Sequence, residues 1–255
     1  MMHEIMESFT LKIGNVFSYN KNMKNILNEK PNGELHGRLL EAVKFVNDSD
    51  IKGKTVLDIG CGYGWCELDF INRGVKKVTG TEITKEDIRT AKKYIKNKNA
   101  EFVVAGATKL PFPDSIFDTV VSWEVIEHIP KNSEDLMFSE VNRVLKKGGT
   151  FYLSTPFRHI LSNAFDPAWW LIGHRHYSKK TLSGYGNKHG FKVIDIRVKG
   201  KFFQVYGWVD LYVWKWIFRR KSPIQNWLNK KIDEEYEDKN GYANIFMKYQ
   251  KRKSN

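Results

Sequence analysis

The sequence predicts an α/β protein in which one sheet carries helices on both faces. In the stretch 56–65 an apolar run with two β-branched residues precedes glycines at positions 60, 62 and 64. Such a run is typical of a buried parallel strand, and the glycines let the backbone turn tightly beside a ligand. From residue 34 onward, predicted strands and helices alternate, which is the pattern of a doubly wound sheet. Ligands of such sheets bind outside the carboxyl ends of the strands.

Each predicted helix and strand follows from a local pattern in the sequence. Amphipathic spacing and helix end signals predict helices over 34–46, 65–72, 85–96, 133–145 and 178–188. Thr84 is the expected N-cap of the helix over 85–96, and Gly148-Gly149 are expected to end the helix over 133–145. Runs rich in β-branched and aromatic residues predict strands at 56–59, 78–82, 102–105, 117–122, 150–155, 191–199 and 244–250.

The length of 255 residues suits one domain with appended segments. Residues 1–33 are polar, rich in Asn and Lys, and end at Pro31-Asn32-Gly33, so we interpret them as an N-terminal arm or lid. The domain then covers 34–255. An aromatic and basic insertion occupies 200–243, before the last strand.

Composition limits the partners and the location. The chain has 42 basic and 29 acidic side chains, a formal net charge of +13, which favours nucleic acid, phosphorylated substrates or an acidic membrane surface. Cys61 and Cys66 are too far apart in sequence for a Cys-x-x-Cys pair and form no disulfide framework. No apolar run with a cleavage site stands near the N-terminus, so the cytoplasm is the expected location.

The glycine turn and the second strand indicate the ligand. A dinucleotide fingerprint needs its third glycine at position 65, where Trp65 stands instead. Asp58 beside the turn would repel a pyrophosphate but suits a positively charged ligand such as S-adenosylmethionine. Glu82 ends the second strand, 22 residues after Gly60, and can accept hydrogen bonds from both hydroxyls of a ribose.

With these motifs the chain resembles the class I S-adenosylmethionine-dependent methyltransferases, in particular their type 11 branch with the ubiquinone-pathway enzymes. The likeness continues through 105–112, 117–122 and 145–151 and covers about residues 35–199. It implies a Rossmann-like sheet of order 3-2-1-4-5-7-6, mostly parallel with an antiparallel last strand, and a helical insertion before that strand. It also implies S-adenosylmethionine as cofactor. The cofactor-binding residues implied are Asp58, Gly60, Cys61, Gly62, Gly64, Glu82, Ile83, Gly106, Ala107, Thr108 and Trp123.

One position departs from the family pattern. Members usually carry an acidic residue for the adenine amino group where this chain has Gly106. We expect the adenine to be held by the backbone N–H of Ala107 and by packing against Leu110.

The stretch 123–130 directly follows the fourth strand. Glu124, Glu127 and His128 are spaced to share one face of a helical turn and to converge on a divalent metal or a proton. The phrase resembles that of small-RNA 2′-O-methyltransferases and ubiquinone-pathway O-methyltransferases, where a histidine after strand five completes a metal site. His174 and His176 are the candidates here, and the expected set is Glu124, Glu127, His128 and His176.

Two alternatives to the metal site stay open. Without a metal, His128, His174 or His176 would act as the general base, and the expected catalytic residues are His128, His176 and Glu124. The other reading is a loop that packs against the cofactor and uses its polar groups for capping.

Aromatic residues gather in two places. Phe165, Trp169 and Trp170 are expected to surround an acceptor pocket. The run 202–218 holds three tryptophans and two tyrosines and is followed by Arg219-Arg220-Lys221, but Asp210 and Lys215 argue against a membrane span. It suits a helix on a membrane surface, with Gln204, Gly207 and Asp210 on one side, or a lid or dimer interface.

The expected function is a methyltransferase acting on the oxygen of a small-molecule, glycan or lipid-linked acceptor, in the cytoplasm or peripheral at the inner membrane surface. An RNA methyltransferase is the first alternative, because the net charge favours it, although no RNA-binding module is recognisable. The second alternative is a protein that binds S-adenosylmethionine without catalysis.

Overall fold

The computed structural model describes residue 25 and residues 27–253. Most of the expected N-terminal arm, residues 1–24 and 26, lies outside the described residues. The described chain contains a seven-stranded sheet of order β3-β2-β1-β4-β5-β7-β6, as predicted. Its strands are β1 (Thr55–Ile59), β2 (Lys77–Glu82), β3 (Ala100–Val104), β4 (Phe117–Trp123), β5 (Leu145–Pro156), β6 (Phe191–Lys199) and β7 (Asn244–Lys251).

The strand directions also agree with the prediction. Neighbours from β3 to β5 pair in parallel, whereas β7 pairs antiparallel with both β5 and β6. The carboxyl ends of the parallel strands therefore meet at one edge of the sheet, which is where ligands of such folds bind.

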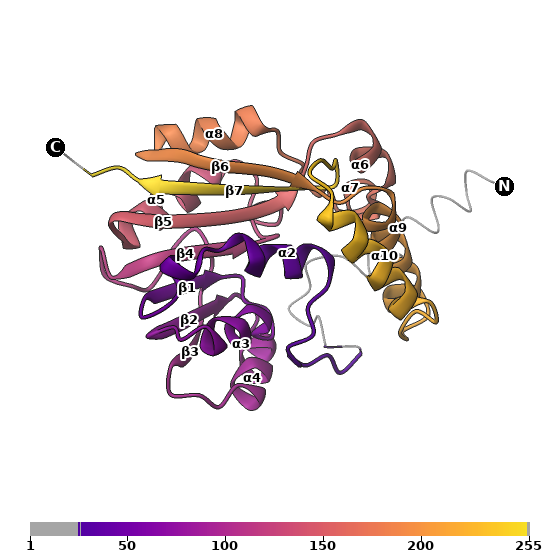
Figure 1. Cartoon of the computed structure of the whole chain (residues 1–255), viewed down its shortest axis with the longest axis horizontal. Coiled ribbons are helices and arrows are strands. Elements are labelled where there is room, and N and C mark those ends of the chain that lie inside the picture. Colours follow the sequence, from indigo (N-terminus) through magenta and orange to yellow (C-terminus); the bar gives the residue numbers. More distant parts are fainter. Residues whose placement is uncertain (1–24, 26, 254–255) are drawn as a thin grey trace.

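Helices cover both faces of the sheet (Figure 1). On one face lie α2 (Gly37–Phe45), α3 (Trp65–Asn72), α4 (Lys85–Tyr94) and α10 (Gln225–Glu237), and the core there includes Phe45, Phe70 and Tyr152. On the other face lie α5 (Glu134–Val144) and α8 (Lys179–Lys188), packed around Phe138 and Phe151. Because the helices cover the two faces of the sheet, the edge at the carboxyl ends of the parallel strands is left for a site.

One local prediction is wrong, and another is confirmed in position only. The helix α5 ends at Val144 and β5 begins at once, so Gly148-Gly149 lie within the strand instead of ending the helix. A Cβ on Gly149 would lie 2.9 Å from the carbonyl oxygen of Asp118, so glycine here permits a close approach of β4 and β5. Thr84 does occupy the N-cap position of α4, but its side chain makes no capping hydrogen bond.

The insertion before β7 is helical, as predicted. It consists of α9 (Phe202–Leu211), a π-helical continuation η2 (Tyr212–Ile217) and α10. With α6 (Ile160–Phe165) and α7 (Pro167–Ile172), these elements gather at the end of the sheet where β5 and β6 terminate (Figure 1). Within the described residues, no helix is long and apolar enough to cross a membrane.

Candidate functional site

One side of the glycine turn after β1 packs against neighbouring residues, and its other side is open. Gly60, Gly62 and Gly64 all have positive φ, which explains the need for glycine. The N–H groups of Gly60 and Cys61 donate to the carbonyl of Thr81, which ties the turn to β2. A Cβ on Gly60 would collide with Val125, but nothing lies within 4 Å of a Cβ placed on Gly62. A ligand can therefore approach the backbone at Gly62.

Two buried carboxylates lie beside this turn without partners. Asp58 is 1 % exposed and its Oδ1 has no hydrogen-bond partner; burial and the charge of Glu82 raise its pKa to about 8. Glu67 on α3 is fully buried, neither of its oxygens has a partner, and burial followed by the charge of Asp58 raises its pKa. Unpartnered buried acids are costly, so the surroundings of the glycine turn suit a ligand that brings positive charge.

Other predicted cofactor residues surround the same edge. The carboxylate of Glu82 accepts from the N–H of Ile83, 2.7 Å away, which fixes it at the end of β2, while the side chain of Ile83 is exposed. Trp123 ends β4; it is buried and its Nε1 has no partner. The unpartnered atoms on β1 and β4 and the open space at Gly62 fit the demands of S-adenosylmethionine, a cationic ligand with polar groups along its length.

The segment after β3 offers no acidic side chain for an adenine at Gly106, as the sequence indicates. A Cβ there would meet nothing within 4 Å, and no side-chain carboxylate can extend from this position. Ala107 and Leu110 are buried in the main core, and Thr108 is half-buried. The N–H of Leu110 donates to Glu140 at 2.7 Å, which holds the turn in place.

Glu124 does not share a face with Glu127 and His128, contrary to the prediction. Its φ of 56° is left-handed, so the chain reverses there instead of starting a helical turn. Its carboxylate accepts hydrogen bonds from Ser154 at 2.7 Å and Asn244 at 2.9 Å. These contacts place Glu124 among the ends of β5 and β7, away from the expected convergence.

Glu127, His128 and His174 do come together. Their ligand atoms lie within 4.8 Å of one another. The Nε2 atoms of His128 and His174 are 3.3 Å apart, and His174 Nε2 is 3.8 Å from Oε1 of Glu127. That Oε1 is buried and has no partner, whereas Oε2 accepts from the hydroxyl of Thr155.

The charge states of this cluster follow from its surroundings. Burial, followed by the charge of Glu124, raises the pKa of Glu127. Desolvation and the neighbouring His174 lower the pKa of His128 to about 3, although the residue still reaches solvent. His128 is therefore neutral at physiological pH.

Asp166 orients two histidines, and sequence reasoning missed it. Its Oδ2 lies 2.8 Å from Nδ1 of His174 and 2.8 Å from Nε2 of His176. Burial opposes ionisation of Asp166, but the hydrogen bonds from the two histidines hold its pKa below the ordinary value. In the tautomer that carries its proton on Nδ1, His174 donates to Asp166, and its Nε2 has a lone pair 3.3 Å from Nε2 of His128.

His176 cannot take the role predicted for it. Its side chain is fully buried, and its second nitrogen, Nδ1, lies 2.8 Å from Oδ1 of Asn163. Both ring nitrogens therefore have partners. Of the predicted residues, Glu127 and His128 come together with His174 and not with Glu124 and His176, whereas His176 forms a second group with Asp166 and His174.

The predicted aromatic acceptor pocket is only partly present. Trp169 packs edge-on against His176, with ring centres 5.0 Å apart. Phe165 and Trp170 are 57 % and 69 % exposed and face solvent instead. From α9 the buried Trp208 approaches His176 from another side, with ring centres 6.4 Å apart.

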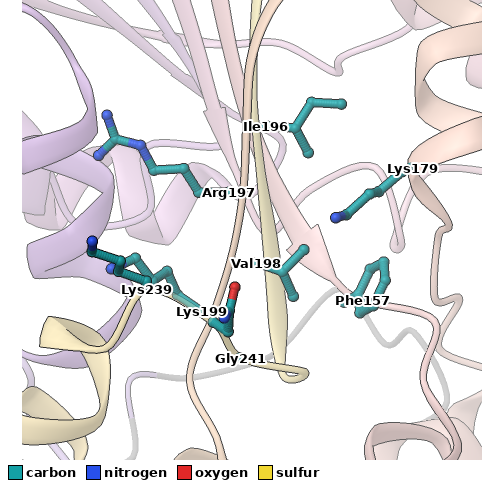
Figure 2. Close-up of a pocket in the computed structure, with 9 residues that line it drawn as sticks. Phe157, Lys179, Ile196, Arg197, Val198, Lys199, Lys239 and Gly241 are labelled. Atoms are coloured by element: carbon teal, nitrogen blue, oxygen red, sulfur yellow. The ribbon is translucent and has the colours of Figure 1, made fainter.

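A basic notch of about 440 Å³ lies at the end of β6. Figure 2 shows Lys179 on one side of this strand and Arg197, Lys199 and Lys239 on the other. Arg197 is paired with Asp195 and Glu41, and Lys199 donates to backbone carbonyls. None of the predicted site residues lines this notch.

The two clusters at the sheet edge are contiguous. Val125, between Glu124 and Glu127, packs against Gly60 of the glycine turn. The histidine pair therefore lies beside a pocket suited to a cationic cofactor. This arrangement suits transfer of a group from the cofactor to an acceptor whose proton a histidine removes.

Residues 57–153 match a family model described as a methyltransferase domain. This part of the chain is therefore a methyltransferase domain. Among solved structures, a S-adenosylmethionine-dependent methyltransferase from Mesorhizobium loti is 16 % identical with a TM-score of 0.61, covering 84 % of this chain and 97 % of its own. The cyclase SpnF has a TM-score of 0.61 at 17 % identity and covers 98 % of this chain and 94 % of its own. These likenesses concern the fold.

Curated relatives share the methyltransferase domain but not the whole chain. A sterol 24-C-methyltransferase of Gibberella zeae is 36 % identical over 39 % of this chain and 27 % of its own length. A fatty-acid O-methyltransferase of Mycolicibacterium smegmatis is 34 % identical over 40 % and 37 %. A phthiotriol/phenolphthiotriol dimycocerosates methyltransferase of Mycobacterium tuberculosis is 30 % identical over 54 % and 53 %. The chain thus spans between about a quarter and a half of the length of these relatives.

Sequence signals existed for two of the missed groups. Asp166 precedes Pro167, and Asp followed by Pro at the first helical position is a helix start signal; the carboxylate does cap α7 by accepting from Ala168. Glu67 is an acidic residue between apolar neighbours in the first turn of α3. Neither pattern indicated a buried carboxylate at the site.

Proposed function

We propose that this protein transfers the methyl group of S-adenosylmethionine to a hydroxyl oxygen of a small, lipid-type acceptor. The observation that supports this proposal is the position of His174. Asp166 orients this histidine, and it lies near the glycine turn, where Asp58 and Glu67 are buried with unpartnered oxygens. The sulfonium is already an activated methyl donor, so the protein has to align the acceptor, exclude water and take up a proton.

In the proposed reaction the acceptor oxygen attacks the methyl carbon. An O–CH₃ bond forms as the S–CH₃ bond breaks, and the bonding electrons stay on sulfur, which becomes a neutral thioether. The acceptor proton moves to Nε2 of His174, and Asp166 stabilises the imidazolium that results. Glu82 would bind the ribose, and Asp58 would face the positive charge of the cofactor.

The same histidine pair offers a second use. Glu127, His128 and His174 would hold a divalent ion, because Oε1 of Glu127 lacks a partner and the two Nε2 atoms face each other. Nitrogen and oxygen ligands of this kind suit zinc, iron or manganese. Such an ion would supply Lewis acidity to lower the pKa of an acceptor hydroxyl.

The lipid-type acceptor is supported by two observations. The relatives' names include sterol, fatty-acid and dimycocerosate methyltransferases. Aromatic side chains of α7 and α9 surround His176 beside the cluster. RNA is the second candidate, supported by the net charge of +13.

The test is methyl transfer from labelled S-adenosylmethionine to cell-extract fractions enriched in lipid, glycan or RNA. We expect label in the lipid fraction, and loss of it with His174→Asn but not with the surface control Lys92→Ala. Label confined to RNA would favour the second candidate. Calorimetry with S-adenosylhomocysteine accompanies the assay, and binding without transfer to any fraction would indicate a cofactor-binding protein without catalysis.

A further inference from the structure

Six large apolar side chains at the carboxyl end of the sheet are exposed to solvent by 53 % to 79 %. They are Ile160, Phe165, Trp170, Phe202, Ile217 and Phe218. We call them the apolar face. Their elements adjoin, since α6 packs on α9, η2 continues α9, and Figure 1 shows α6, α7 and α9 at the same end of the sheet. Large exposed apolar side chains on adjoining elements point to an interaction surface.

The helix α9 buries polar as well as apolar side chains, namely Gln204 and Asp210 together with Val205 and Trp208. Its polar residues point inward, where Gln204 accepts from the hydroxyl of Tyr236 and Asp210 accepts from Ser222. Its outward side carries Phe202 and the stacked ring of Tyr206. A helix in water normally buries its apolar side and exposes its polar side. The exposed aromatic residues therefore require a partner of low polarity.

A basic rim borders the apolar face. Arg219, Arg220 and Lys221 directly follow Phe218 and are all exposed. In the described part of the chain, no carboxylate pairs with any of the three. The guanidinium of Arg220 lies over the ring of Phe218, 5.6 Å from its centre, so the charge and the apolar surface are immediate neighbours.

Two of the helices that carry the apolar face also contact His176 on their inner side. On α7, Trp169 contacts His176 on the inner side and Trp170 is exposed on the outer side. On α9, Trp208 contacts His176 and Phe202 is exposed. A surface bound to the apolar face would thus lie one helix away from His176.

We propose that the apolar face is a docking surface for an anionic lipid bilayer. Aromatic side chains favour the membrane interface, and the basic rim contacts the phosphates of the headgroups. A second copy of this chain is the weaker occupant, because each copy carries a net charge of +13 and its own basic rim. The inference goes beyond methyl transfer, since docking does not require the reaction.

The test is flotation of the full chain with vesicles at low salt. One set contains phosphatidylcholine alone, and the other contains phosphatidylcholine with phosphatidylglycerol. We expect the protein to float with the anionic set. Ile217→Ser with Phe218→Ser should lower the partition coefficient at least about tenfold, and replacing Arg219, Arg220 and Lys221 by Gln should lower it roughly a hundredfold.

Matched controls lie elsewhere on the surface. Leu136→Ser removes a 57 % exposed apolar side chain from α5, and a triple change of Lys92, Lys93 and Lys96 to Gln removes three exposed charges at α4. Both controls should float like the unmodified protein. Binding of S-adenosylhomocysteine is measured alongside, so that a failed methyltransferase proposal is distinguished from failed docking.

Three results would overturn the inference. The first is an unmodified protein that stays at the bottom with anionic vesicles. The second is an apolar-face variant that floats as well as its control. The third is a sedimentation experiment in which the unmodified protein is a dimer, the double Ser variant is a monomer, and neither binds lipid, because the occupant would then be a second copy.

Discussion

Asp58 is the group that we expect to couple cofactor binding to pH. Burial, together with the charge of Glu82, raises the pKa of its carboxyl to about 8. At pH 7 about nine-tenths of the free protein then carries a proton on Asp58. A cationic cofactor interacts with the ionised carboxylate, so its binding has to release that proton.

The size of the effect follows from the pKa. Ionising Asp58 at pH 7 costs about 1.4 kcal/mol, because the pKa lies about one unit above that pH. The dissociation constant of S-adenosylmethionine should fall about tenfold between pH 6 and pH 7, a range in which the α-amine of the cofactor remains largely charged. Calorimetry at pH 7 in two buffers of different ionisation enthalpy should report release of about 0.9 proton.

Asp58→Asn tests the assignment. The variant cannot ionise, so the pH dependence of binding should disappear. A charge-assisted hydrogen bond contributes about 1.5–3 kcal/mol, and the ionisation cost offsets about 1.4 kcal/mol of it, so the loss of affinity at pH 7 should stay below about 2 kcal/mol. Glu101→Gln, at an exposed residue paired with Lys77, is the control. A pH slope that persists in Asp58→Asn would refute the reasoning.

The same titration affects folding with a definite sign. In the unfolded chain Asp58 loses its proton near the ordinary aspartate pKa of 3.8, but the folded protein keeps it up to about pH 8. The free energy of unfolding of the cofactor-free protein should therefore decline as pH rises from about 4 to 8. Glu67, whose pKa is also raised by burial, contributes in the same direction. Urea unfolding at pH 5 and pH 8 measures the difference.

Four further predictions concern single residues. Glu82→Ala should weaken cofactor binding by about 1–3 kcal/mol in calorimetry, and an unchanged dissociation constant would contradict its role at the ribose. Gly62→Val should abolish binding, because the branched side chain would occupy the open space beside the turn, and its positive φ should also lower the unfolding free energy; normal binding would remove the glycine turn from the cofactor site. His174→Asn should lower turnover about 10²–10⁴-fold with cofactor affinity unchanged. His176→Asn should instead lower the unfolding free energy by about 1–3 kcal/mol and leave the pH profile of turnover in place; a shifted profile would give His176 a chemical role.

The sheet was predictable because its signals are local. The run 56–59, the glycines after it and Glu82 are close in sequence, and their strands lie side by side in the predicted order. Strand order beyond β4 came from resemblance, since neither the antiparallel β7 nor its place between β5 and β6 follows from periodicity. The predicted boundary between α5 and β5 is wrong because Gly148-Gly149 do not end the helix. Gly149 instead permits the close approach of β4 and β5.

The site was predictable only in part, because it depends on contacts between distant segments. Spacing correctly drew attention to Glu127 and His128, but it could not show that Glu124 adopts a left-handed conformation and pairs with Ser154 and Asn244. The choice between His174 and His176 depends on Asp166 and Asn163, which bind both nitrogens of His176. No local pattern contains that information.

Spacing predicted the two faces of the insertion's first helix but not which of them is buried. Its polar residues were expected along one side of a helix, and they do lie inside, because Tyr236 and Ser222 supply partners for Gln204 and Asp210. Once those polar groups are satisfied internally, the aromatic residues that remain cannot all be buried, and several stay exposed beside the basic rim. The side of α9 that contacts His176 and the side that is exposed are thus set by the same internal hydrogen bonds. Replacing Gln204 or Asp210 should consequently disturb both the histidine cluster and the apolar face, whereas replacing Phe218 should disturb only the latter.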